Sequence, residues 1–173
     1  WLWTEKIDGT NIRVIWEGDS GVRFMGKTDK AAIPGFLLSY LQCTFTAIDL
    51  DRCFPGPAIL YGEGYGAKIQ KNGELYRPDV GFILFDVFCG DVWLTRQSVE
   101  DIAEELFIPI VPVVGIGTLV SAVNLARNGF RSTVAPAREA EGLVMCPTLE
   151  LRDREGNRII TKVKHKDFPI EVQ

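Results

Sequence analysis

Residues 82–88 read Phe-Ile-Leu-Phe-Asp-Val-Phe, a nearly continuous apolar run. Runs of this length and composition are typical of a strand that is buried on both faces of a sheet. An unpaired carboxylate inside such a strand costs free energy, so we expect Asp86 to have a partner. The run therefore predicts a protein built on a sheet, with one paired acid in a buried strand.

Short extended segments separated by turn residues account for much of the chain. Their apolar patterns, flanked by Gly, Pro, Asn and Asp, favour strands over helices. The predicted strands are residues 11–16, 22–25, 58–61, 80–88, 142–146 and 158–164. Helical patterns with start and stop signals lie at residues 34–48, 98–107 and 119–128. The predicted fold class is therefore α+β, with antiparallel β-sheets dominant and helices flanking them.

The composition is that of one compact domain. The chain has 173 residues, 46% hydrophobic and 24% charged, which is enough for a sizeable core but too short for two ordinary domains. The proline-containing segments at 55–57 and 109–112 are too brief to be interdomain linkers. No apolar stretch approaches the roughly 20 residues that span a bilayer, and the N-terminus lacks a signal pattern. We expect residues 1–173 to form a single cytoplasmic domain without membrane contact.

Cysteine, histidine and net charge narrow the functional classes. Four cysteines without CxxC spacing and a single histidine, His165, argue against a zinc site, and the thiols are expected to be reduced. A net charge of −4 means that a polynucleotide has to meet local basic patches. Two such patches are Lys68, Lys71 and Arg77, and Arg152, Arg154, Arg158, Lys162, Lys164 and Lys166. A plain exposed hairpin around Asn72-Gly73 explains the first patch equally well.

The segment Lys6-Ile7-Asp8-Gly9 places a lysine and a carboxylate at the end of an extended stretch. Alternate side chains of a strand share a face, so Lys6 and Asp8 are expected to point together while Ile7 points away, and Gly9 permits a tight reversal. A lysine beside a carboxylate in a pocket suits a nucleophile. The same tetrapeptide also describes two solvated charges at a turn, so the choice depends on the rest of the chain.

Four further motifs follow this segment: Gly62-Glu63, Phe85-Asp86, Glu141-Gly142 and Lys162-Val163-Lys164. With them the chain resembles the covalent nucleotidyltransferases, the superfamily of RNA ligases, DNA ligases and mRNA capping enzymes. It is most similar to the RNA ligase 2-type branch, in which Thr4 to Asn11 and Gly26-Lys27-Thr28 also have counterparts. The resemblance spans nearly the whole chain. It implies an ATP-grasp-like nucleotidyltransferase domain of the DNA/RNA ligase superfamily.

The chemistry that this resemblance implies is nucleotidyl transfer. Lys6 would attack the α-phosphorus of ATP, pyrophosphate would leave, and AMP would stay on Lys6 through a phosphoramidate bond. An ordinary lysine, with a pKa near 10.4, is a free amine in roughly one molecule in 2,500 at pH 7, so nearby cations have to favour that form. Lys162 and Lys164 share one face of a predicted strand and would meet the triphosphate together, Lys162 at the α-phosphate. Lysines kept on an edge strand for solubility are the plainer interpretation.

Charge on the transferred phosphoryl group and on pyrophosphate calls for a divalent cation. The resemblance implies magnesium or manganese held by Asp8 and Glu141, with Asn11 hydrogen-bonded to a metal-bound water. It also counts Glu141 among the catalytic residues. As the alternative, all three are ordinary polar side chains that face solvent and bind nothing, and this interpretation is strongest for Asn11.

The remaining implied contacts concern the nucleotide. Phe85 would stack on adenine, and Glu63 would accept hydrogen bonds from the ribose hydroxyls. Glu5 or its backbone would face the adenine edge, Ile7 would belong to the same pocket, and Lys27 stands where this branch has an arginine near a phosphate. As alternatives, Phe85 is plain core and the glycines beside Glu63 mark only a turn.

The function that these residues indicate is the catalytic domain of an ATP-dependent RNA ligase acting on RNA ends or nicks. Its three steps would be formation of lysyl-AMP, transfer of AMP to a 5′-phosphate, and attack by a 3′-hydroxyl. A capping-type guanylyltransferase, the adenylation domain of a DNA ligase and a non-catalytic nucleotide- or nucleic-acid-binding module stay open. We expect a monomer. Because five residues precede Lys6 and few follow Lys164, we also expect a truncated N-terminus and no C-terminal oligonucleotide-binding domain.

Overall fold

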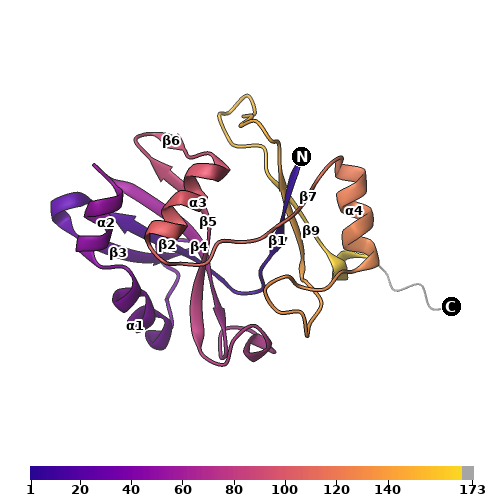
Figure 1. The fold of residues 1–173 in the computed structure, drawn as a ribbon, viewed down its shortest axis with the longest axis horizontal. Coiled ribbons are helices and arrows are strands. Elements are labelled where there is room, and N and C mark those ends of the chain that lie inside the picture. Colours follow the sequence, from indigo (N-terminus) through magenta and orange to yellow (C-terminus); the bar gives the residue numbers. More distant parts are fainter. Residues whose placement is uncertain (169–173) are drawn as a thin grey trace. The chain divides into compact units, whose positions relative to one another are not determined.

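The computed structural model describes residues 1–168, which form two compact units. The first unit contains residues 1–7 and 111–168, and the second contains Asp8–Ile110 (Figure 1). The chain therefore crosses from one unit to the other inside the KxDG segment, between Ile7 and Asp8. Each unit has its own sheet and its own apolar cluster. Whether the two units act as the single domain that we expect stays a prediction.

A four-stranded antiparallel sheet forms the first unit. Its strand order is β7 (Val113–Ile116), β1 (Leu2–Lys6), β8 (Gly142–Cys146) and β9 (Thr161–Lys164). Helix α4 (Leu119–Asn128) and the 3-10 helix η3 (His165–Asp167) complete the unit. Alanines of α4 pack with apolar side chains of the two central strands: Trp3, Ala122, Ala126, Leu143 and Met145. This packing fixes β1 and β8, the strands between which Lys6 and Gly142 pair.

A five-stranded antiparallel sheet forms the second unit. Its strand order is β3 (Val22–Gly26), β2 (Thr10–Trp16), β4 (Ala58–Gly66), β5 (Val80–Cys89) and β6 (Val92–Trp93). Its helices are α1 (Gly35–Thr44), α2 (Ala47–Cys53), α3 (Arg96–Glu105) and the 3-10 helices η1 (Gly18–Ser20) and η2 (Gly73–Leu75). Apolar side chains of the three α-helices pack on those of β2, β4 and β5. Two antiparallel sheets with flanking helices confirm the predicted α+β class.

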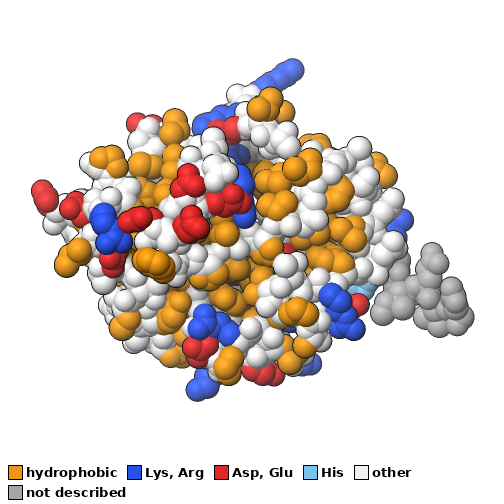
Figure 2. Space-filling model, in the orientation of Figure 1, with side chains coloured by type: hydrophobic (Ala, Val, Ile, Leu, Met, Phe, Trp, Pro, Cys, Tyr) orange, Lys and Arg blue, Asp and Glu red, His pale blue; other side chains and the backbone are white. Residues whose placement is uncertain are grey.

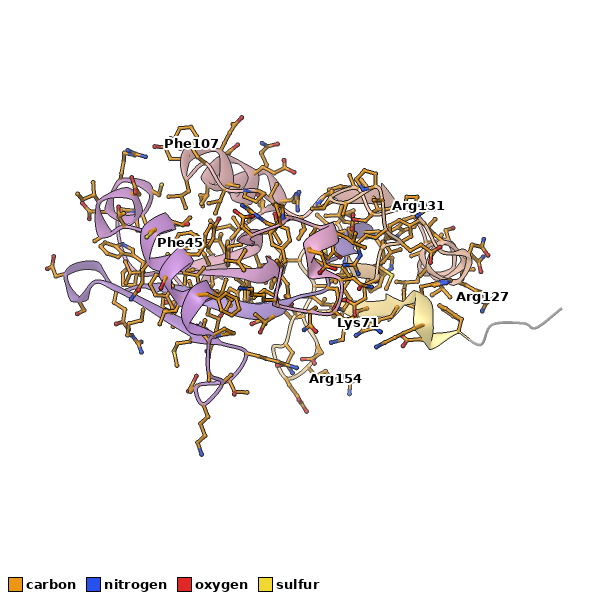
Figure 3. All side chains as sticks on the ribbon, turned by 90° about the horizontal axis from the view of Figure 1, so that it is seen from below. Phe45, Lys71, Phe107, Arg127, Arg131 and Arg154 are labelled. Carbon is orange, nitrogen blue, oxygen red and sulfur yellow. The ribbon has the colours of Figure 1, made fainter. Side chains whose placement is uncertain are left out.

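The helix predicted at 34–48 is two helices, because Phe45 and Thr46 interrupt it. Phe45, which is labelled in Figure 3, has non-helical backbone angles. Its ring packs edge-on against Phe82, with 5.1 Å between the ring centroids. The Thr46 side chain accepts a hydrogen bond from the Asp49 amide and caps α2. Since apolar residues continue across the break, the sequence pattern indicates one helix where the buried ring and the threonine cap make two.

Glycines in β4 leave room for core side chains. A Cβ at Gly62 would lie 2.1 Å from the Phe82 ring, and a Cβ at Gly64 would lie 2.7 Å from Leu37. Both distances are far below van der Waals contact, so a larger residue at either position would force the core to repack. Glu63 therefore lies in a regular strand and not in a glycine-rich turn.

A β-bulge changes which side chains of β5 face the core. The pairing of β4 with β5 shifts by one residue at Phe85, which has no partner of its own in β4. Phe82 and Leu84 lie in the apolar cluster before the shift, and Val87 lies in it afterwards. Bulges re-aim side chains in this way, and the Phe85 ring is left partly exposed. The predicted buried strand is confirmed, with Phe85 excluded from the cluster.

The surface is chemically mixed. The face drawn in Figure 2 carries acidic, basic and apolar side chains side by side. The four cysteines are free thiols, of which Cys43 is exposed. Within residues 1–168, no helix combines the length and the apolarity that a membrane crossing needs.

Candidate active site

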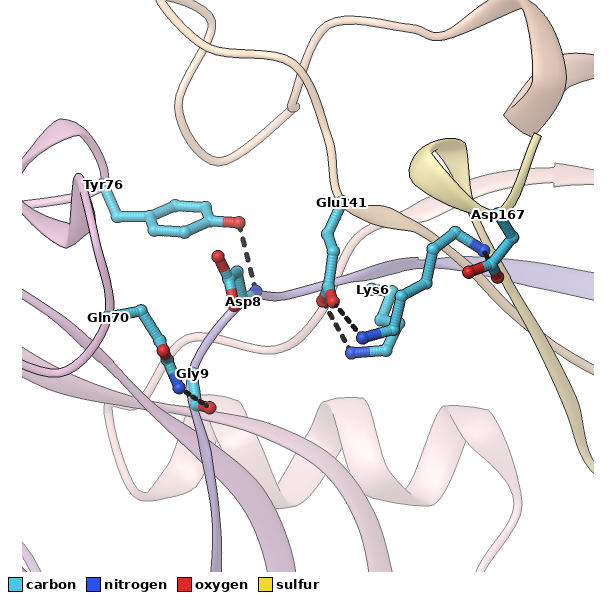
Figure 4. Close-up of polar contacts among 8 residues, drawn as sticks. Lys6, Asp8, Gly9, Gln70, Tyr76, Glu141 and Asp167 are labelled. Atoms are coloured by element: carbon cyan, nitrogen blue, oxygen red, sulfur yellow. Dashed lines mark hydrogen bonds and ion pairs between the residues drawn. The ribbon is translucent and has the colours of Figure 1, made fainter. Parts of the chain in front are cut away.

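Lys6, Glu141 and Lys164 form a linked cluster in the first unit (Figure 4). The Lys6 Nζ atom lies 2.6 Å from Glu141 Oε2, and the Lys164 Nζ atom lies 2.6 Å from Glu141 Oε1. The Glu141 side chain is 13% exposed and the Lys6 side chain 19%. Charge-assisted hydrogen bonds of this kind are among the stronger ones in proteins. One partly buried carboxylate thus holds two ammonium groups, and it brings together three of the predicted catalytic residues.

The strand register places these side chains together. Gly142 pairs with Lys6 of β1 on one side and with Lys164 of β9 on the other. Glu141 directly precedes β8, so it stands at the end of the strand that separates the two lysines. A Cβ on Gly142 would lie 2.0 Å from the Val163 carbonyl oxygen. The close approach of β9 therefore requires glycine after Glu141, which gives the Glu-Gly motif a structural reason.

The two lysines shift the ionisation of Glu141. Burial raises the pKa of this carboxyl group, but hydrogen bonds from Lys164 and Lys6, together with their positive charges, lower it by more. The net result is a pKa below the ordinary value of a glutamate. Glu141 is therefore a carboxylate at neutral pH and is suited to binding a cation.

This depressed pKa makes a prediction about stability in acid. A carboxyl group whose pKa is lower in the folded than in the unfolded state stabilises the fold above its unfolded pKa, and this contribution is lost as pH falls through the folded value. We expect the wild type to be more stable than Glu141→Gln at neutral pH and to lose that advantage below about pH 4.3. Thermal unfolding of both proteins in metal-free buffer, across a series of pH values, measures this difference in stability. An advantage that stays constant into acid would contradict the prediction.

Side chains alternate along β9 as expected. Val163 packs against the apolar cluster of the first unit, whereas Lys162 is exposed. Lys162 pairs with Val144 of β8, next to the cluster formed by Glu141 and the two lysines. The Lys164 amide donates a hydrogen bond to the Asp167 carboxylate at 2.9 Å, which fixes the end of β9. Contact between Lys162 and a phosphate stays a prediction.

Glu5 and Ile7, on either side of Lys6, are buried, with 1% and 4% of their surface exposed. The Glu5 carboxylate accepts hydrogen bonds from the Ser132 hydroxyl and from the Thr133 amide, the latter at 2.7 Å. These partners lie 127 and 128 positions away in the chain. Neither belongs to a recognisable motif, so no local pattern indicates them.

In the second unit, the loop between β4 and β5 forms hydrogen bonds with Asp8 and Gly9, the first residues after the chain enters this unit (Figure 4). The Asp8 amide donates a hydrogen bond to the Tyr76 hydroxyl at 3.2 Å, and the Gln70 side-chain amide donates to the Gly9 carbonyl at 2.9 Å. A Cβ on Gly9 would lie 2.3 Å from the Gly64 carbonyl oxygen. The glycine of the KxDG segment is therefore required by the approach of β4. The sequence does not indicate Tyr76 or Gln70, because both contact backbone atoms.

The other predicted nucleotide contacts also lie in the second unit. Asn11 and Glu63 are directly opposite each other in β2 and β4. Phe85 lies at the bulge in β5, and Lys27 is exposed directly after β3. The partial exposure of the Phe85 ring favours the stacking interpretation over plain core. Contact of these four side chains with a nucleotide stays a prediction.

Glu141 in the first unit and Asp8 in the second each offer the carboxylate oxygens that a hard divalent cation prefers, and a metal site that joins them stays a prediction. In the part of the chain that the structure describes, no three His, Cys, Asp or Glu side chains gather closely enough to hold a metal ion by themselves. Both Glu141 oxygens already lie 2.6 Å from ammonium groups. A cation that binds Glu141 therefore has to compete with the charges of Lys6 and Lys164, and it has to keep water among its ligands, as Mg²⁺ commonly does.

In the first basic patch, the Arg77 side chain makes contacts within the protein. Its guanidinium pairs with Asp79 and lies 5.9 Å from the Tyr65 ring centroid. Lys68 and Lys71 are exposed in the loop between β4 and β5, where Figure 3 shows Lys71. Of this patch, the two lysines are the side chains that face solvent.

The second basic patch is spread over β9, η3 and the loop that joins β8 to β9, residues 147–160. Lys164 belongs to the Glu141 cluster, and Arg152 pairs with Glu150 at 2.7 Å. Arg154 is exposed at the turn in the middle of the loop (Figure 3), and basic side chains project from this region in Figure 2. Contact of the loop with a polynucleotide stays a prediction.

The fold is similar to that of solved RNA ligases from Naegleria gruberi. A mutant of that ligase with AMP and Mn matches at 18% identity and a TM-score of 0.71, over 96% of this chain and 49% of that chain. The ligase with PPi matches over the same shares at 19% identity and a TM-score of 0.71. A mutant with ATP and Mn does so at 18% identity and a TM-score of 0.70. This chain spans about half the length of these ligases, and at such identity the likeness shows a common fold.

The chain combines two antiparallel sheets with flanking helices and a strand-borne lysine held at a carboxylate, in a fold that it shares with the Naegleria gruberi ligases. The family model for RNA ligases matches residues 1–164. The chain therefore belongs to the RNA ligase family, and the predicted superfamily is confirmed. No curated protein matches its sequence.

Proposed function

We propose that this chain is the nucleotidyltransferase domain of an ATP-dependent RNA ligase, with Lys6 as its nucleophile. The observation that carries the proposal is the pairing of Lys6 and Lys164 with the two oxygens of Glu141, at 2.6 Å each, in a chain of the RNA ligase family. Nucleotidyl transfer needs a nucleophile, positive charge for the phosphates and a ligand for a divalent cation. The first unit contains a candidate for each.

Lys6 carries the first two steps. After losing a proton, its Nζ atom attacks the α-phosphorus of ATP, and a nitrogen–phosphorus bond forms as the bond to pyrophosphate breaks. Lys164 and Lys162 provide positive charge for the phosphate oxygens and for the leaving pyrophosphate. A 5′-phosphate oxygen then attacks the same phosphorus and releases Lys6. Finally a 3′-hydroxyl displaces AMP and seals the strand.

The contact between Lys6 and Glu141 has to open before the first step. An ammonium group that donates to a carboxylate has no free lone pair, so Lys6 has to leave Glu141 and lose a proton before it attacks. Magnesium or manganese, with Glu141 and Asp8 as the proposed ligands, would offset phosphate charge. The Naegleria gruberi ligase structures with Mn and AMP or ATP support a divalent cation.

The proposed nucleotide contacts follow the sequence motifs. Phe85 stacks on adenine, Glu63 accepts hydrogen bonds from the ribose, Lys27 meets a phosphate and Asn11 bonds to a metal-bound water. The bulge supports the role of Phe85, because it leaves the ring partly exposed. Of Glu5, the backbone is the better candidate for the adenine edge, since both carboxylate oxygens already accept hydrogen bonds.

The proposed substrate is an RNA end or nick. Membership of the RNA ligase family supports RNA as the strand to be sealed. The cytoplasmic location and the monomeric state that we expect from the sequence stay predictions.

Covalent labelling tests the proposal. The protein is incubated with magnesium and with ATP, GTP or NAD labelled in the adenylate or guanylate phosphate, then separated on a denaturing gel. We expect acid-labile label from ATP alone, and peptide mass spectrometry should locate AMP on Lys6. Label from GTP would indicate a capping-type guanylyltransferase. Label on another residue, or none with either magnesium or manganese, would contradict the proposal.

A further inference from the structure

A buried polar contact holds Glu5 and Ser132 together in the first unit. Both residues are 1% exposed. Glu5 Oε1 accepts a hydrogen bond from the Ser132 hydroxyl at 2.5 Å, and Glu5 Oε2 accepts one from the Thr133 amide at 2.7 Å. The Ser132 hydroxyl oxygen accepts in turn from the Ala135 amide at 2.9 Å. Both carboxylate oxygens and the serine hydroxyl therefore have fixed partners.

Ser132 belongs to a hairpin-like loop, residues 130–140, that leads directly into Glu141. Backbone pairing joins its two sides: Phe130 with Ala140, Arg131 with Glu139, and Ser132 with Arg138. Glu5 is bonded at the turn of this loop, and Glu141 follows its last residue. The 130–140 loop thus connects the Glu5 carboxylate to the carboxylate that holds the two lysines.

We propose that Glu5 is a positioning residue, which acts through Ser132 and the 130–140 loop to set the Glu141 carboxylate and, with it, the Lys6 amine. The proposal rests on the proposed function of Lys6. Glu5 and Lys6 are neighbours in β1, and Glu141 Oε2 lies 2.6 Å from the Lys6 Nζ atom. Glu5, Ser132 with its loop, Glu141 and Lys6 are therefore linked in a closed ring. Loosening the ring at Ser132 therefore removes one of the links that hold the Glu141 carboxylate at the Lys6 amine, in addition to the pairing of Gly142 with Lys6.

The surroundings of Glu5 support positioning over direct contact with a nucleotide. Successive side chains of a strand point to opposite faces, so Glu5 lies on the face of β1 away from Lys6. Its partners are a hydroxyl and an amide, which satisfy the carboxylate without a cation. Burying an acid in this way is costly and is tolerated where hydrogen bonds fix one geometry.

A double-mutant cycle tests this role. The rate of lysyl-AMP formation is measured against ATP concentration for Glu5→Gln, Ser132→Ala and the double variant. Each single change is expected to lower the maximal rate by roughly ten- to 100-fold, as displacement of a reacting group does, with half-saturating ATP unchanged. The double variant should be no slower than the slower single, because both changes break one contact.

Thr133→Ala is the matched control. It removes a hydroxyl from the neighbouring residue, whose side chain is exposed and whose backbone amide still bonds to Glu5. This variant should react at the wild-type rate. Additive losses in the cycle would overturn the proposal. So would a rise in half-saturating ATP in Glu5→Gln alone, or lower melting temperatures with unchanged rates.

A second readout needs no nucleotide. The rate at which an amine reagent modifies Lys6 is followed by mass spectrometry, with exposed Lys30 as the internal reference. Ser132→Ala is expected to raise the Lys6 rate severalfold, because the amine is released from Glu141, and to leave Lys30 unchanged. If the wild type forms no lysyl-AMP, the proposed function fails. The positioning role of Glu5 is then tested by the rate of Lys6 modification alone. An unchanged Lys6 rate would then overturn the positioning role.

Discussion

Lys6→Arg is expected to take up no covalent label from ATP. Arginine keeps the positive charge and can still donate to Glu141, so the charge of the cluster is unchanged. Its guanidinium does not lose a proton at physiological pH, and no lone pair is available to attack phosphorus. We expect the rate of AMP attachment to fall by at least about 10⁴-fold, as when a nucleophile is removed. A denaturing gel after incubation with α-labelled ATP measures it.

The same substitution at an exposed lysine is the control. Lys30 lies after β3, and Lys30→Arg should take up label at the wild-type rate. Both variants should keep the wild-type melting temperature, so that a loss of label cannot be assigned to unfolding. Label retained by Lys6→Arg would show that another residue accepts AMP.

The elements that the sequence predicts best include one strand and one helix whose apolar patterns are uninterrupted. The predicted bounds of β8 and α4 agree with the structure. β6, with two residues, and β7, with four, are too short to leave a pattern. β4 continues to Gly66 although its pattern stops at Tyr61, because the glycines that interrupt the pattern make room for core side chains.

For the candidate site, the sequence likewise identifies residues that belong to local motifs but not the contacts between distant segments. Lys6, Glu141 and Lys164 each belong to a short motif, so the sequence identifies them, whereas their contact depends on the register of three strands. Ser132 bonds to Glu5 across 127 positions, and its surroundings in the sequence are those of any loop serine. Contacts of this range arise from the fold, and single-sequence patterns do not contain them.

Glu141→Gln is expected to slow lysyl-AMP formation by about 100-fold or more, the usual cost of removing one preorganised electrostatic contact. Glutamine keeps the shape of the side chain but offers one acceptor oxygen in place of two, and its NH₂ group faces an ammonium. Lys6 and Lys164 then have to share one oxygen, without the negative charge that holds them in the wild type. The variant also lacks the proposed metal ligand, so more magnesium should be needed for the half-maximal rate.

Rate measurements on Glu141→Gln across magnesium concentrations separate two roles of this carboxylate. Glu139→Gln, at an exposed position in the preceding loop, is the control and should behave as wild type. Since the Lys6 amine donates to Glu141 and has to leave it before attacking, a faster variant would show that Glu141 restrains the nucleophile and is not part of the catalytic machinery. A slower variant with unchanged magnesium dependence would refute the metal assignment alone, because the lysines would then be the only cations that Glu141 has to hold.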